Sequence, residues 1–168
     1  MTQHKSRPKA QTDMTATPPQ AATSGPVLFA YDGSQLAQLA IEQASQQLAP
    51  GRDVLILCVW QPADVGFVPA GEQHFDAQNA TEVQKAAQET AAKGASLAEK
   101  AGFRSQSLVV NAAPTWKGIV DVAEEHQVSL IVLGSHRRTG IIGHLLGSVT
   151  AAVVTHSAVS VLVVHQRT

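Results

Sequence analysis

The sequence predicts an α/β fold in which a doubly wound, five-stranded parallel sheet is flanked by helices. Strand-like and helix-like segments alternate along the 168 residues, as in folds built from right-handed β-α-β crossovers. Two of the strand-like segments, residues 53–60 and 130–133, are apolar on both faces, which is typical of strands buried in a parallel sheet. With 44% hydrophobic and 15% charged residues, the chain has enough apolar material for one well-cored domain, expected at residues 27–168.

The first strand and helix are predicted from a change in hydrophobic period. Residues 27–31 (VLFAY) form a short apolar run that ends in the turn Asp32-Gly33-Ser34. From Gln35 onward, apolar residues recur at spacings of three and four, which indicates a helix with one buried face. Pro50-Gly51 is expected to stop this helix.

The second strand is expected at residues 53–60 (DVLILCVW) and, being apolar on both faces, should be central in the sheet. It contains Cys58, the single cysteine, which excludes an internal disulfide and favours a buried structural thiol over a nucleophile. Residues 61–80 carry prolines and glycines without periodicity and are predicted to be a long loop. An alanine-rich helix is expected at residues 81–101, with Gly102 at its C-terminal stop.

The second half of the domain repeats the alternation of strands and helices. Apolar spacing predicts that one of its helices buries Trp116, Ile119, Val120 and Ala123. The strand at residues 130–133 is expected to end where Gly134 breaks the aliphatic run. The remaining elements are expected at residues 104–110 (strand), 115–126 (helix), 147–156 (helix) and 160–165 (strand).

Composition limits the classes of function. The formal net charge of −1 and a pI near 6.6 argue against a general nucleic-acid or anionic-membrane surface. The first 26 residues are polar, lack an apolar leader region and are predicted to be a disordered tail. No apolar run approaches the roughly 18 residues that a membrane span needs, and the histidines lack zinc-ligand spacing. A cytoplasmic protein without a metal site is expected.

An anion site is predicted within residues 128–150, where a buried strand runs into a glycine-bearing cationic loop. The loop carries His136, Arg137 and Arg138, and it ends at Gly147-Ser148, where a helix begins. The free amide groups and dipole of a helix N-terminus favour an anion such as phosphate. Two structural alternatives stay open: an ordinary helix start capped by serine, and a solvated basic turn.

Asp32 follows the first strand, and in a parallel sheet it should reach the same edge as the anion loop. There it could contact a polar group of a ligand, such as a ribose hydroxyl or a metal-bridged phosphate. The structural alternative is that Asp32 caps the first helix.

Taken together, these segments resemble the universal stress protein family, over nearly everything after the tail. The stretches VLFAYDGS and DVLILCVW are similar to its first two strands, and GSHRRTGIIGHLLGSVT is similar to its C-terminal block. ATP-binding members carry Gly, two residues, Gly, nine residues, then Gly and Ser or Thr. Gly134 and Gly147-Ser148 match that spacing, but Arg137 replaces the second glycine. Glycine permits a closer phosphate approach, whereas arginine can offer a guanidinium fork to phosphate.

The resemblance implies ATP as a ligand, with Mg²⁺ as a possible companion, and a homodimer formed through the C-terminal strand. Val59 would then lie near the adenine at the end of the second strand. The full set of contacts implied by the family is Ala30, Asp32, Val59, Leu133, Gly134, His136, Arg137, Gly147, Ser148, Val149 and Thr150.

The function expected from the sequence is that of a nucleotide-binding stress-response sensor or regulator. No general base is convincingly placed for attack on the γ-phosphate, so at most slow ATP hydrolysis is expected. The alternative, favoured by Arg137, is a dimerisation and protein-interaction module of the same fold that binds no nucleotide. An adenylating enzyme would call for a Ser-Gly-Gly loop after the first strand, which Asp32-Gly33-Ser34 does not supply.

Overall fold

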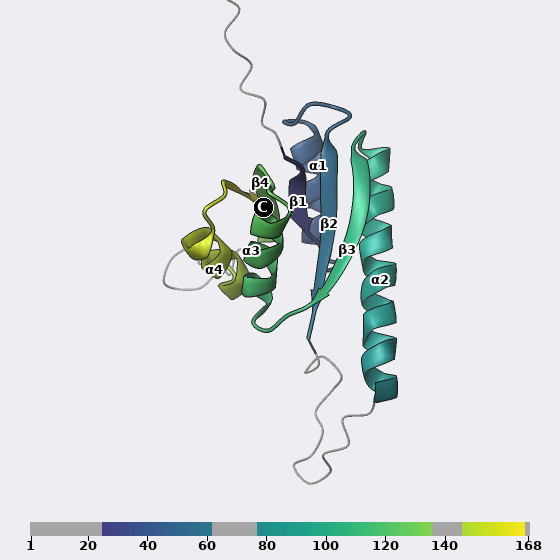
Figure 1. Ribbon diagram of the computed structural model, residues 1–168. Helices are drawn as coiled ribbons and strands as arrows, with labels where there is room; N and C mark the ends of the chain where they lie inside the picture. The colour runs from purple at the N-terminus through teal and green to yellow at the C-terminus, as the bar shows by residue number, and fades with distance from the viewer. Residues whose placement is uncertain (1–24, 62–76, 136–145, 167–168) are drawn as a thin grey trace, which may run out of the picture.

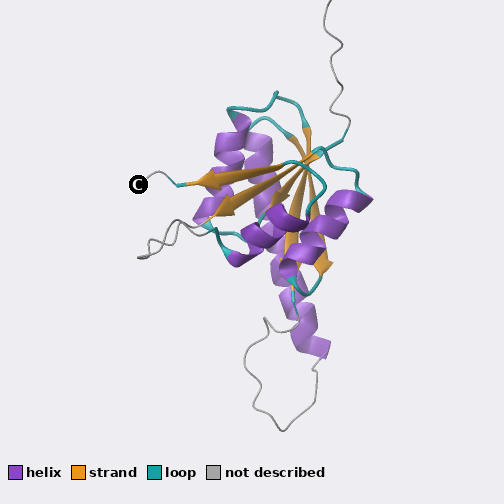
Figure 2. Cartoon of the chain, turned by 90° about the vertical axis from the view of Figure 1, so that its left-hand side faces the viewer, coloured by secondary structure: helices purple, strands orange, loops and turns teal. Residues whose placement is uncertain are grey.

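The computed structural model describes residues 25–61, 77–135 and 146–166, with helices on both faces of one parallel sheet (Figures 1 and 2). The strand order is β3-β2-β1-β4-β5. The predicted fold class is confirmed. The elements, in chain order, are β1 (Val27–Ala30), α1 (Gln35–Ser45), β2 (Asp53–Trp60), α2 (Ala77–Lys100), β3 (Arg104–Asn111), α3 (Thr115–Glu125), β4 (Leu130–Ser135), α4 (Ser148–His156) and β5 (Val161–His165).

Two hydrophobic cores lie on opposite faces of the sheet. One joins alternate residues of β1 and β2, such as Phe29 and Ile56, to the buried faces of α1 and α2. The other joins the intervening residues, such as Leu28 and Leu57, to α3 and α4. This alternation follows from the period of two along a strand, and it explains why β1 and residues 54–60 of β2 are apolar at every position. Cys58 is buried beside Ala87 and Ala91 of α2, as expected for a structural thiol.

The chain order places a topological switch between β1 and β4. From β1 the chain passes through α1 to β2 and then through α2 to β3, after which α3 carries it back across the sheet to β4. In open α/β sheets, ligands bind outside the carboxyl ends of the strands at such a switch. The predicted contact residues at the ends of β1 and β4 therefore lie at the position that this topology favours.

Several details differ from the sequence-based expectations. β4 does not end at Gly134: it continues to Ser135, because Gly134 and Ser135 pair with Val164 and His165 of β5. β2 lies inside the sheet, but the middle strand is β1. α2 begins at Ala77 rather than at residue 81. Among the residues described, no helix combines the length and apolar character that crossing a bilayer requires.

Trp116 of α3 is less buried than the sequence predicts, and it contacts α4. Trp116 is only half-buried, and its ring stacks on that of His156 with centroids 4.3 Å apart. His156 is the last residue of α4, and its Nδ1 lies 2.8 Å from the carbonyl oxygen of Ala152. The predicted tail and most of the predicted loop, residues 1–24 and 62–76, lie outside the described residues.

Candidate functional site

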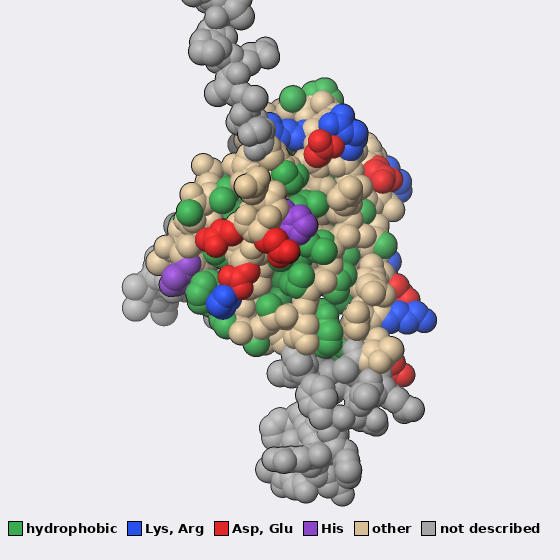
Figure 3. All heavy atoms as spheres, in the orientation of Figure 1, with side chains coloured by type: hydrophobic (Ala, Val, Ile, Leu, Met, Phe, Trp, Pro, Cys, Tyr) green, Lys and Arg blue, Asp and Glu red, His purple; other side chains and the backbone are tan. Residues whose placement is uncertain are grey.

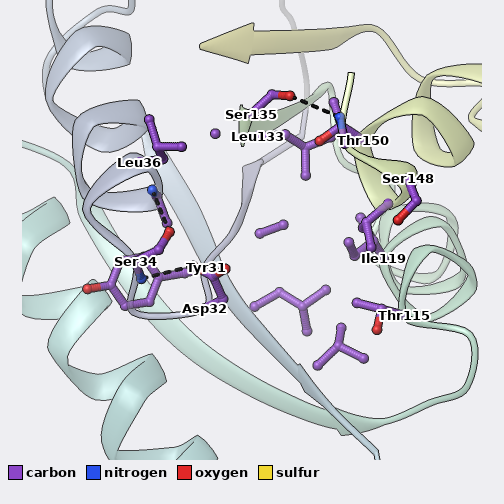
Figure 4. A pocket seen from close by; sticks show the side chains of 17 residues that line it. Tyr31, Asp32, Ser34, Leu36, Thr115, Ile119, Leu133, Ser135, Ser148 and Thr150 are labelled. Carbon is purple, nitrogen blue, oxygen red and sulfur yellow. Dashed lines mark hydrogen bonds between the residues drawn. The ribbon is translucent and has the colours of Figure 1, made fainter. Parts of the chain in front are cut away.

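A pocket of about 260 Å³ opens at the carboxyl edge of the sheet, between the ends of β1, β2 and β4 and the starts of α1, α3 and α4. Its volume is slightly below the range of about 300–1,000 Å³ typical of small-molecule sites. Figure 4 shows Asp32 and Ser34 on one side of the pocket and Thr115, Ile119 and Ser148 on the other. Three helix N-termini therefore converge on one cavity.

The turn after β1 builds one wall of the pocket. Ser34 caps α1, because its side chain accepts a hydrogen bond from the Ala37 N–H at 3.2 Å. Asp32 Oδ1 accepts from the Ser34 N–H at 2.9 Å and so supports the turn rather than the helix. The alternative that Asp32 is the helix cap is therefore wrong. Asp32 is exposed, and its second carboxylate oxygen has no partner among the described residues.

Gly134 is required where β4 passes α1. A Cβ atom on Gly134 would lie 2.5 Å from the carbonyl oxygen of Leu36 and 3.0 Å from the amide nitrogen of Ala37. Backbone atoms cannot move aside as a flexible side chain can. The absence of a side chain at Gly134 therefore lets α1 start directly against the end of β4, at the wall of the pocket.

Gly147 has the opposite environment, because a Cβ atom there would meet nothing within 4 Å. It is the N-cap of α4 in an extended conformation, with φ −56° and ψ 151°, and no side chain caps the helix. Its amide donates to Ser135 Oγ at 3.4 Å, which joins the end of β4 to the start of α4. Ser148 is the first helical residue, so the alternative that serine caps this helix is wrong as well.

Val59 presents a peptide edge to the pocket. Tyr31 N donates to Leu57 O on the β1 side of β2, whereas Ala112 N donates to Trp60 O on the β3 side. Peptide groups alternate along a strand, so the N–H and C=O of Val59 point to the β1 side. β1 ends at Ala30, opposite Leu57, and gives Val59 no strand partner there. One donor and one acceptor thus stand side by side at the pocket.

The wall contributed by α3 was not predicted from the sequence. Thr115 and Ile119, one turn apart on α3, line the pocket. Gln61 Nε2 donates to Thr115 Oγ1 at 2.6 Å and ties the end of β2 to the start of α3. The signal was present, since Thr115 opens a helix after a strand in the same way as Ser148. Ser34 and the buried Ser135 also line the pocket and were missed.

The described residues that line the pocket carry little charge. Asp32 is its only charged side chain among the described residues, and those residues contain no group of three or more metal-ligating side chains. Tyr31 is buried beside the pocket, and desolvation raises the pKa of its hydroxyl, partly opposed by a hydrogen bond with Gln38 and assisted by the charge of Asp32.

The structure brings together all of the predicted contact residues that it describes. His136 and Arg137 lie outside the described residues. The predicted contact residues that line the pocket are Ala30, Asp32, Val59, Leu133, Gly134, Gly147, Ser148, Val149 and Thr150. Their role in binding stays a prediction.

Comparison with known sequences identifies relatives over most of the chain. A universal stress protein of Mycolicibacterium smegmatis is 32% identical over 151 residues, covering 84% of this chain and 46% of that protein. Universal stress protein Rv2005c of Mycobacterium tuberculosis is 34% identical over 149 residues, covering 84% and 45%. Universal stress protein MJ0577 of Methanocaldococcus jannaschii is 39% identical over 69 residues, covering 41% and 42%. The chain thus spans about half the length of the curated relatives it matches.

Solved structures share the fold. That of MJ0577 has a TM-score of 0.68 at 26% identity and covers 85% of this chain and 96% of its own. A universal stress protein in complex with cAMP has a TM-score of 0.56 at 25% identity, covering 84% and 96%. A universal stress protein family protein of Arabidopsis thaliana, with AMP bound, has a TM-score of 0.60 at 16% identity and covers 85% of this chain and 92% of its own. At this identity the similarity shows a common fold and no more.

The family model described as the universal stress protein family matches residues 24–165, a range that includes every strand and helix in the described part of the chain. The chain therefore belongs to the universal stress protein family.

Proposed function

We propose that the protein binds an adenine nucleotide in this pocket and acts as a stress-response sensor or regulator. The observation that carries the proposal is the convergence of three helix N-termini on a cavity whose far wall presents the free peptide edge of Val59. Helix N-termini favour phosphate. A peptide N–H and C=O side by side match the N1 acceptor and the 6-amino donor of adenine.

The phosphate end of the ligand would lie at α4. Gly147 leaves open space in front of the helix, and Ser148 and Thr150 add hydroxyl groups beside the first-turn amides. Relatives of the same fold are known with cAMP and with AMP bound. We propose ATP as the ligand here, with Arg137 replacing the glycine of the family motif, and with Asp32 positioned to contact a ribose hydroxyl or a Mg²⁺ ion bound by phosphate.

A regulatory role suits the pocket better than a catalytic one. Asp32 is the only described carboxylate in the lining, and no second carboxylate stands beside it to activate water. General base catalysis needs a group within hydrogen-bond reach of the attacking water. We therefore propose that occupancy itself is the signal and that hydrolysis of ATP is slow at most.

The first test is calorimetry with ATP on purified, nucleotide-free protein, with and without Mg²⁺. Saturable binding at or below cellular ATP concentration supports the proposal. A folded protein that binds neither ATP nor AMP would refute it.

Two variants locate the site. Asp32→Ala and Gly147→Val should each abolish ATP binding while leaving the thermal midpoint close to that of the parent, because Asp32 is exposed and a side chain at Gly147 meets open space. Asp121→Ala is the matched control, since Asp121 is an exposed acid on α3 that pairs with Lys117 and does not line the pocket. If Asp32→Ala and Gly147→Val both bind as tightly as the parent, the assigned site is wrong.

The second candidate function is a dimerisation and interaction module without nucleotide. It is favoured by the partly exposed apolar side chains of Leu146, Val149 and Val154, which are 36–45% exposed at α4 and just before it. Figure 3 shows hydrophobic and acidic side chains together on the face that carries α3 and α4. β5 is an edge strand of the sheet, and we propose that two copies pair through it. Absence of nucleotide binding combined with a stable dimer would favour this candidate.

The variant Arg137→Gly, which restores the glycine of the family motif, distinguishes the two candidate functions. Tighter ATP binding in this variant would mean that the arginine obstructs the site, whereas weaker binding would mean that it contacts phosphate. A protein that binds no nucleotide in either form supports the interaction module.

A further inference from the structure

We propose that Thr115 is a specificity residue that donates a hydrogen bond to a ring nitrogen of the adenine base, N3 or N7, and that Gln61 fixes the direction of this donor. The inference rests on the proposed binding of an adenine nucleotide and deepens it. It concerns the wall of the pocket formed by α3, beside the free peptide edge of Val59.

The hydroxyl group of Thr115 keeps its proton available for a ligand in the cavity. A threonine hydroxyl carries one proton and two acceptor lone pairs. Gln61 Nε2 donates to Thr115 Oγ1 at 2.6 Å, so one lone pair is already used. The hydroxyl proton of Thr115 is then the group left to interact with a molecule in the cavity that this residue lines. An amide donor on one side thus leaves the hydroxyl as a donor on the other.

Thr115 lines the same pocket as Val59, whose peptide edge is proposed to hold the base. The first turn of α3 is pressed against the end of β2: a Cβ atom on Gly118 would lie 3.3 Å from Val59 Cγ1 and 2.6 Å from the Cβ of Ala112. Thr115 and Ile119 share the face of α3 that lines the pocket. Figure 4 shows Thr115 and Ile119 side by side at the pocket, and Val59 lines the same cavity. A base held by the peptide edge of Val59 would therefore lie against this face.

An adenine held by Val59 would still have ring nitrogens that can accept a hydrogen bond. Val59 would use N1 and the 6-amino group of adenine, which distinguishes adenine from guanine because guanine reverses the donor and acceptor at these positions. The acceptors that remain on the ring are N3 and N7, and pyrimidines have no equivalent of N7. A hydroxyl donor that reaches N7 therefore adds a selection for purines that the peptide edge alone does not provide.

The test compares AMP with its 3-deaza and 7-deaza analogues, each of which replaces one ring nitrogen by C–H. We expect the parent protein to bind one of the two analogues about two- to tenfold more weakly than AMP, the range for loss of one neutral hydrogen bond. In Thr115→Val, which keeps the shape but lacks the hydroxyl, AMP should bind more weakly and the affinity ratio between AMP and that analogue should fall to about one.

Gln61→Glu tests the positioning role and stands in if Thr115→Val fails to fold. A carboxylate accepts the hydroxyl proton of Thr115 instead of donating to its oxygen, which leaves no donor for the base. The affinity ratio should again fall to about one. Any repulsion between the new charge and the phosphate cancels in this ratio, because both ligands carry the same phosphate. Thr155→Val is the matched control: it removes an exposed hydroxyl that donates to Ala151 O on α4, and it should keep the ratio of the parent.

Each outcome decides the proposal. A parent that binds AMP but does not distinguish it from either analogue overturns the role of Thr115, and so does a ratio that Thr115→Val leaves unchanged; both results leave adenine-nucleotide binding intact. A parent that binds ATP but not AMP is tested in the same way with the 3-deaza and 7-deaza analogues of ATP. A parent that binds neither AMP nor ATP refutes the proposed function and this inference together, and it is recognised by the absence of any binding signal.

Discussion

Gly134 and Gly147 line the same pocket for opposite physical reasons. At Gly134 the backbone of α1 occupies the space where a Cβ would lie, whereas at Gly147 that space is open. Sequence spacing assigned both glycines to phosphate contact. The structure gives Gly134 a packing role that would persist without any ligand, because its contacts are with Leu36 and Ala37.

Gly134→Ala should therefore lower the stability of the protein even when no nucleotide is present. We expect the free energy of unfolding to fall by about 1–3 kcal/mol, the usual cost of inserting a methyl group into a filled space. Gly147→Val is the comparison, and its urea midpoint should stay close to that of the parent. Equal stability of Gly134→Ala and the parent in urea denaturation would contradict the assigned packing role.

Tyr31 offers a direct measurement at this edge of the sheet, because it is the only tyrosine in the chain. Burial raises the pKa of its hydroxyl above the usual 10.0. The neutral form is therefore the stable one in the folded protein, and its contribution to stability is present below pH 10 and is lost as the pH rises through the raised pKa. Phenolate absorbance should show a midpoint above that of the urea-unfolded chain, and Tyr31→Phe should remove the signal. A midpoint equal to that of the unfolded chain would contradict the burial of the hydroxyl.

At the scale of elements, the sequence predicted the alternation of strands and helices because hydrophobic period is a local signal. It also placed Asp32 and Gly147 correctly at the ends of elements. It did not resolve contacts between distant segments. The bond between Gln61 and Thr115 joins residues 54 apart, and no local pattern reports it. The turn Asp32-Gly33-Ser34 offered two candidate caps, and only the observed bond from Ala37 N to Ser34 Oγ decides between them.

The ion pair between β2 and β3 lies at the opposite edge of the sheet from the pocket. Arg104 Nε donates to Asp53 Oδ1 at 2.7 Å, and this bond lowers the pKa of the Asp53 carboxyl. A lowered pKa stabilises the folded state at pH values above the unfolded pKa of about 3.9. This stabilisation disappears as the pH falls through the lowered value.

Asp53→Asn should therefore be less stable than the parent at pH 7, and the difference should disappear as the pH falls below about 4. Both side chains are about two-thirds exposed, so the effect is small and weakens in high salt. Urea denaturation across this pH range measures it. Arg104→Gln should give the same result, and combining the two substitutions should add little. Fully additive effects would show that the pair does not interact.

At the scale of the whole molecule, β5 leaves one edge of the sheet open. Ile131 N donates to Ser160 O, so Ser160 faces β4. By alternation, the amides of Leu162 and Val164 face β4 as well, whereas those of Val161 and Val163 face outward. An outward amide is the group through which a second copy could extend the sheet.

Val163→Pro should convert a β5-paired dimer into a monomer. Proline removes the outward N–H of Val163 and no bond to β4, which is the setting in which an edge strand tolerates proline. Light scattering after size-exclusion chromatography gives the mass of the particle, and ATP titration shows whether the pocket survives. Val163→Thr keeps the amide and serves as the control. A dimer that persists in Val163→Pro with unchanged affinity for itself would exclude pairing through this edge.

The burial of Cys58 inside the sheet has a practical consequence. It is the only cysteine of the chain, and its side chain is packed against α2 with 7% of its surface exposed. A cysteine introduced at Leu146, which is 37% exposed next to Gly147, would then be the one thiol open to a maleimide dye. Such a conjugate would carry a fluorophore beside the mouth of the pocket. Its fluorescence would follow ligand binding in real time at nanomolar protein concentration.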